Sequence, residues 1–105
     1  MSNPSSPETE LLQSILEPLL EDVRYWLGRS LDLFESQRLD FISETEQSNL
    51  VARVKNALKE VEAAKMLYEV TSKQVGIEIS AMMPWHNLLL ECQSIGMRYH
   101  QNKAN

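Results

Sequence analysis

The sequence contains few of the residues that make turns and cross-links. Its 105 residues include three Gly and four Pro, and Pro4 and Pro7 both lie within the first seven positions. A β-sandwich or barrel needs turn residues every ~8–12 positions, so this scarcity argues against both folds. The single cysteine, Cys92, excludes a disulfide within the chain and any zinc or iron–sulfur site built from several cysteines.

Positive charge and long apolar runs are also scarce. Ten Lys and Arg stand against 15 Asp and Glu, a net charge of −5, which is the wrong sign for a nucleic-acid-binding domain. No apolar run approaches the roughly 18 residues of a membrane-spanning helix, and the first ten residues do not form a signal peptide. We therefore expect no nucleic-acid partner, no membrane span, a reduced Cys92 and a cytoplasmic location.

The chain does contain helical periodicity, beginning after a disordered Ser/Pro head at residues 1–7. Ser6 suits the N-cap and Pro7 the first turn of a helix over residues 8–43. Its apolar positions follow helical spacing and form a wide face: Leu12, Leu16, Leu19, Leu20, Val23, Trp26, Leu27, Leu31, Phe34 and Phe41. Because this phase continues through Pro18, we expect a kinked helix there rather than two separate helices.

Two further helices are predicted, over residues 48–75 and 81–100. The first has a heptad seam in which steps of four and three alternate: Leu50, Val54, Ala57, Val61, Ala64, Tyr68, Thr71 and Val75. Gly76 suits the position after its C-terminus. The second presents one apolar face: Trp85, Leu88, Leu89, Cys92, Ile95 and Tyr99. Residues 8–100 are thus expected to form a single helical domain, and residues 101–105 a frayed tail.

These lengths predict an all-α, elongated antiparallel helical hairpin with a third, shorter helix packed on one half, as a three-helix bundle. The predicted register places Phe41 near Leu50 and Val51, Phe34 near Leu58, Leu31 near Val61, and Val23 near Tyr68. A third helix of about 26 Å covers only the half of the rod that is far from the hairpin tip. We therefore expect the double apolar row at Leu12, Leu19 and Trp26 to be covered and the tip to stay exposed.

An exposed apolar tip indicates an interface, and we expect a homodimer through it. The candidate interface residues share apolar character and a place near the turn: Phe34, Phe41, Ile42, Leu50, Val51 and Val54.

Catalytic and cofactor motifs are missing from the sequence. No Glu is followed three residues later by His, as a di-metal bundle would require, and His86 and His100 on one helix lie about 21 Å apart. Gly28, Gly76 and Gly96 are isolated, which excludes the glycine-rich nucleotide loops. We therefore expect no catalytic residue, no metal site and no cofactor.

Two segments are candidate surfaces for a partner protein. Met82, Met83, Trp85 and His86, grouped around Pro84, suit a binding surface, although Trp85 and one Met also suit a plug at the end of the bundle. The second helix opens with the bases Arg53, Lys55 and Lys59, which suit a docking patch for an acidic partner. A solvated face that pairs with Asp40 and Glu44 across the turn is the other interpretation.

Three stretches resemble a family of short cyanobacterial proteins that is known only as a domain of unknown function. They are ETELLQSILEPLLEDVRYWLGRS (residues 8–30), the middle helix, and VGIEISAMMPWHNLLLEC (residues 75–92). The elements at 18–22 (PLLED) and 82–86 (MMPWH) carry most of the resemblance. It implies a cytosolic protein without an assigned activity, and it transfers no functional residue. It marks Glu17–Asp22 and Met82–His86 as the first places to test.

The leading hypothesis is a non-enzymatic helical interaction module, an adaptor or regulator that self-associates and binds another protein. The alternative is a small-ligand or metal-dependent enzyme whose site forms only at an oligomer interface, where His86 or His100 of two chains could meet. Binding of nucleic acid through the basic patch is disfavoured by the net charge.

Overall fold

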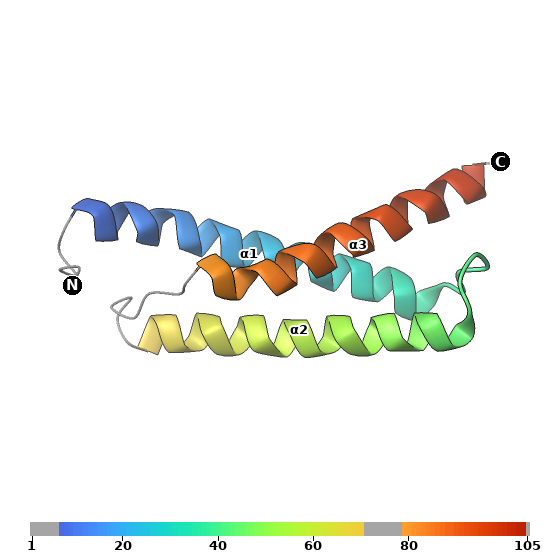
Figure 1. Cartoon of the computed structure of the whole chain (residues 1–105), viewed down its shortest axis with the longest axis horizontal. Coiled ribbons are helices and arrows are strands. Elements are labelled where there is room, and N and C mark those ends of the chain that lie inside the picture. The colour runs from blue at the N-terminus through green and yellow to red at the C-terminus, as the bar shows by residue number, and fades with distance from the viewer. Residues whose placement is uncertain (1–6, 71–78, 105) are drawn as a thin grey trace.

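A computed structural model describes residues 7–70 and 79–104 of the chain, and all of its regular structure within these ranges is helical. Helix α1 spans Pro7–Ser36, α2 spans Glu44–Val70 and α3 spans Ile79–Ala104. Helices α1 and α2 run antiparallel, and α3 returns along them in the direction of α1 (Figure 1). The molecule measures 54 × 22 × 18 Å, so the predicted rod-shaped, all-α three-helix bundle is confirmed.

Helix α1 continues through Pro18, as the unbroken apolar phase predicts, but it ends seven residues earlier than expected. Residues 37–43 form a loop rather than the end of a helix. The loop folds inward because Leu39 is fully buried in the core, a position it could not reach from a continued straight helix. The predicted helix over residues 8–43 is therefore too long at its C-terminal end.

The side chain of Gln47 holds this loop in place from the first turns of α2. Its Nε2 donates hydrogen bonds to the carbonyl oxygens of Phe34 (2.9 Å) and Gln37 (2.7 Å). Its Oε1 accepts from the backbone N–H of Leu39 (2.9 Å) and from Arg38 Nη1 (2.7 Å). Gln47 is the buried polar residue of the core, and its amide satisfies main-chain groups that the end of α1 leaves without helical partners.

Helix α2 begins at Glu44, four residues before its predicted start, because Ser43 caps it. The Ser43 hydroxyl accepts a hydrogen bond from the Glu46 backbone N–H at 3.0 Å. Ser43 and Glu46 have the Ser-x-x-Glu spacing of a capping box, so the sequence does carry a signal for this start.

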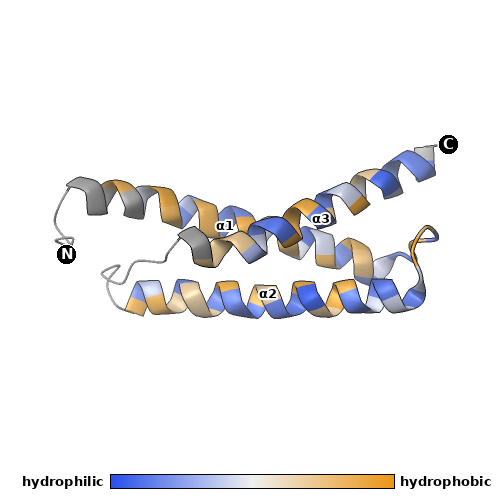
Figure 2. Cartoon of the chain, viewed as in Figure 1, coloured by the Kyte–Doolittle hydropathy of each residue, from blue (hydrophilic) through white to orange (hydrophobic). Residues whose placement is uncertain are grey.

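The heptad seam of α2 is buried as predicted within the described residues. Leu50, Val54, Ala57, Val61 and Tyr68 are all part of the core, whereas Thr71, Val75 and the predicted stop at Gly76 lie outside the described residues. Hydrophobic and hydrophilic residues alternate along this helix, as expected when one face is buried (Figure 2). Of the predicted head at residues 1–7, residues 1–6 lie outside the described residues, and Pro7 is the first residue of α1.

Ion pairs between α1 and α2 show that the register differs from the predicted one. Glu21 pairs with Lys65 (2.5 Å) and Arg24 with Glu62, so the level of Val23 is several residues before Tyr68. The difference arises because the chain reverses within residues 37–43 rather than near Glu46.

Helix α3 is not short. Its 26 residues nearly equal the 27 of α2, and helical structure continues to Ala104 through the segment that was expected to fray. Its N-terminal half packs into the core, and its C-terminal half reaches the hairpin tip. There the Arg98 guanidinium carbon lies 4.5 Å from the centre of the Phe41 ring. Helix α3 is thus longer than expected and contacts the tip through Arg98, but it packs on the core mainly through its first half, while its second half diverges from the bundle (Figure 1).

Candidate functional site

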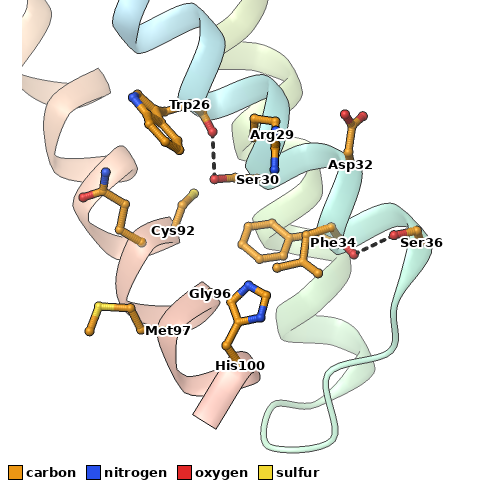
Figure 3. Close-up of a pocket in the computed structure, with 12 residues that line it drawn as sticks. Trp26, Arg29, Ser30, Asp32, Phe34, Ser36, Cys92, Gly96, Met97 and His100 are labelled. Carbon is orange, nitrogen blue, oxygen red and sulfur yellow. Dashed lines mark hydrogen bonds between the residues drawn. The ribbon is translucent and has the colours of Figure 1, made fainter. Parts of the chain in front are cut away.

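A groove of about 600 Å³ opens between α1 and α3, where the second half of α3 diverges from the rest of the bundle (Figures 1 and 3). One wall comes from α1 and the other from α3, and most of the lining is apolar or small. The lining includes Trp26, Ser30, Leu33, Cys92, Gly96, Met97 and His100.

The floor of the groove is lined by small side chains. Ser30 lies on α1, where its hydroxyl donates to the Trp26 carbonyl oxygen at 2.9 Å, and Gly96 lies on α3 (Figure 3). A Cβ built on Gly96 would meet no atom within 4 Å, so the space beside it is open. Small residues at a helix surface permit another helix to approach closely, and the groove therefore has the form of a helix-binding site.

Cys92 lies at the base of this groove, and its side chain is buried, with 1% of the residue exposed. Burial raises the pKa of its thiol to about 11, although a hydrogen bond with Ser30 acts in the opposite direction. The thiolate is the reactive form, so a thiol with this pKa is a poor nucleophile and a poor metal ligand near neutral pH.

Exposed apolar side chains form one row on α1 and one on α3, and each row has one member in the groove lining, Trp26 and Met97 respectively. The row on α1 contains Leu11, Ile15, Leu19 and Trp26, of which Leu19 is 40% and Trp26 47% exposed. The row on α3 contains Met83, Leu90 and Met97, which recur every seven residues and are 47%, 50% and 63% exposed. Leu19 and Trp26 were expected to be covered by the third helix, and the row on α3 was not predicted. The seven-residue spacing of Met83, Leu90 and Met97 is the sequence pattern that could have identified this row.

The predicted tip interface is mostly inside the molecule. Phe34, Leu50 and Val54 are buried in the core of the single chain, and Phe41, Ile42 and Val51 are half-buried against it. The expectation of an exposed tip is wrong because Leu39 folds under the turn and α3 reaches Phe41.

Only some of the residues in the predicted binding surface at Met82–His86 are exposed. Met82 and Trp85 are each 7% exposed, so Trp85 and one Met do fill the bundle, whereas Met83 and His86 face outward. The binding-surface interpretation therefore does not apply to Trp85.

The basic residues of α2 are exposed, and two of them form ion pairs with acids other than the predicted Asp40 and Glu44. Arg53 binds both carboxylate oxygens of Glu91 on α3 at 2.9 Å, and Lys55 lies 3.2 Å from Glu35 on α1. The Arg53 pair lowers the pKa of Glu91. These contacts join helices within one chain, and Lys59 is the remaining exposed member of the predicted docking patch.

The described part of the chain offers neither a metal site nor a membrane-spanning helix. No three His, Cys, Asp or Glu side chains there gather in a way that could hold a metal ion. None of the three helices, within the residues described, is long and apolar enough to cross a membrane.

Comparisons with known proteins identify a family for the chain. No curated protein and no solved structure matches it. Residues 6–101 match the family described as "Protein of unknown function (DUF2605)", and since this match spans most of the sequence, the chain belongs to that family.

Proposed function

We propose that this protein is a non-enzymatic helical interaction module, an adaptor or regulator that works by binding protein helices in the groove between α1 and α3. The observation that carries the proposal is a groove whose two walls each contain an exposed apolar side chain, Trp26 on α1 and Met97 on α3, which continue as rows of exposed apolar residues along both helices. Scattered single apolar residues are normal on a surface, but rows along a groove are typical of binding sites.

The composition of the groove supports this proposal. Trp26 on α1 and Met97 on α3 both line the groove, and Trp and Met are both enriched at protein interfaces. The nearby Cys92 thiol is protonated at neutral pH because its pKa is raised, so the groove offers packing surface rather than a nucleophile. We further propose a cytoplasmic location, in a cyanobacterial cell, where a reduced thiol is expected.

The proposal can be tested by affinity capture with matched variants. Met97→Glu places a charge in the groove, and Met66→Glu makes the same change on α2. These methionines are 63% and 65% exposed, so neither change should unfold the protein. We expect protein partners from the native cytosol to be retained by the wild type and by Met66→Glu but lost from Met97→Glu. Identical sets of captured proteins for all three forms would contradict the proposal.

A further inference from the structure

We infer that the occupant of this groove is a second copy of the chain, packed antiparallel about a twofold axis across the α1/α3 face. This inference rests on the proposed function, and it names the partner of the same site. Its evidence lies in the direction of two helix ends, in their charges and in the size of the face.

The first half of α1 and the second half of α3 both rise away from α2, toward the same side of the molecule (Figure 1). Here they are called the α1 arm (residues 11–22) and the α3 arm (residues 92–104). The α1 arm carries the exposed apolar residues Leu11, Ile15 and Leu19, and the α3 arm carries Met97. Apolar side chains are therefore exposed on both arms, three on the α1 arm and one on the α3 arm.

The arms have opposite charge. The α1 arm contains Glu17, Glu21 and Asp22 and no Lys or Arg, whereas the α3 arm contains Arg98 and Lys103 and no Asp or Glu. Glu21 also pairs with Lys65, and Arg98 lies over the Phe41 ring, so Asp22 and Lys103 carry the charge argument. Figure 2 shows the second half of α3 as mainly hydrophilic. A twofold axis places the α1 arm of each copy beside the α3 arm of the other, so acidic and basic segments meet twice. A parallel arrangement would place acid beside acid, which electrostatic complementarity disfavours.

The size of the face also fits a dimer. Helix α3 has 26 residues, or about 39 Å, and two adjacent helices are about 20 Å wide. Each partner of an interface of standard size contributes roughly 800 Å² of accessible surface, so a stable dimer requires the outer surface of both helices along most of this length. In an antiparallel pair the row of one copy packs into the groove of the other, where Ser30 and Gly96 leave room.

The first experiment measures mass in solution by sedimentation equilibrium, from low to high micromolar concentration. We expect the wild type to reach twice the 12.1 kDa mass of the chain. Met97→Glu should raise the dimer dissociation constant at least about 100-fold, because a twofold interface contains the substitution twice. Met66→Glu should change it less than about threefold, and circular dichroism should show equal helix content in all three forms.

The orientation is tested by exchanging charges. Lys103→Glu should weaken the dimer several-fold, and adding Asp22→Lys to the same chain should recover most of the loss, since acid and base again face each other in the antiparallel pair. Failure of this recovery would overturn the antiparallel arrangement.

Two results would overturn the choice of a second copy. One is a wild type that remains monomeric at high micromolar concentration. The other is a dimer that survives Met97→Glu but dissociates in Phe41→Asp, which would place the interface at the tip. Neither result decides the proposed function, because affinity capture tests independently whether the groove binds another protein.

Discussion

Replacing Gln47 by alanine should be among the most damaging single changes on α2, although Gln47 is a polar residue. The substitution removes all four hydrogen bonds of the side-chain amide. Two of the main-chain groups that lose a partner, the Phe34 carbonyl and the Leu39 N–H, are bonded in buried surroundings. A buried polar group left without a partner costs about 1–3 kcal/mol, so we expect a loss of about 3–4 kcal/mol in the free energy of unfolding.

This loss is large compared with the total of about 5–15 kcal/mol that is typical of a natural domain. It can be measured by urea denaturation followed by circular dichroism, at one fixed protein concentration because self-association would also change the stability. Amide hydrogen exchange gives a local measurement. The Leu39 N–H should be protected in the wild type and exchange rapidly in the variant.

Two further variants separate hydrogen bonding from packing. Gln47→Met fills a similar volume without the amide, so it should cost nearly as much as Gln47→Ala. Gln93→Ala removes an exposed amide from α3 and should cost less than about 0.5 kcal/mol. A stable Gln47→Met beside an unstable Gln47→Ala would show that packing, and not the hydrogen bonds, secures the turn, and this result would refute the reasoning.

Three further predictions concern buried and paired side chains. Trp85→Ala should destabilise the fold by about 3–5 kcal/mol and Met83→Ala by less than about 0.5 kcal/mol, and equal melting temperatures of the two variants would contradict this assignment. The pKa of the Cys92 thiol is raised from 9.0 to about 11, so its stabilising contribution is complete below pH 9 and is lost as the pH rises toward 11. A Cys92→Ala variant should lack this alkaline loss in urea titrations, and a disulfide reagent should label the wild-type thiol slowly at neutral pH. Arg53 lowers the pKa of Glu91 below 4.5, so the pair stabilises the fold above that pH and the contribution disappears as the pH falls through the lowered value. At neutral pH, Glu91→Gln should cost about 0.5–1 kcal/mol, because the pair is half exposed, and the difference from the wild type should vanish in acid.

The sequence was sufficient to predict three helices and most of the core. Apolar spacing is a local property of helical geometry, and the seam from Leu50 to Tyr68 could be identified without knowing what covers it. For Trp85 the sequence left a binding surface and a core plug open, and the structure agrees with the core plug. The scarcity of turn residues argued against β-sandwiches and barrels, and the single Cys excluded a disulfide within the chain.

The position of the turn and the exposed surface required the tertiary structure. Apolar periodicity shows which face of a helix favours burial. Which other helix covers that face depends on how the helices cross. The bonds from Gln47 to Phe34 and Leu39 join positions thirteen and eight residues apart, and no local pattern encodes them. They end α1 early and bury the predicted interface. Because α3 crosses α1 and then diverges, Trp26 and Met97 remain exposed beside a groove that periodicity alone could not reveal.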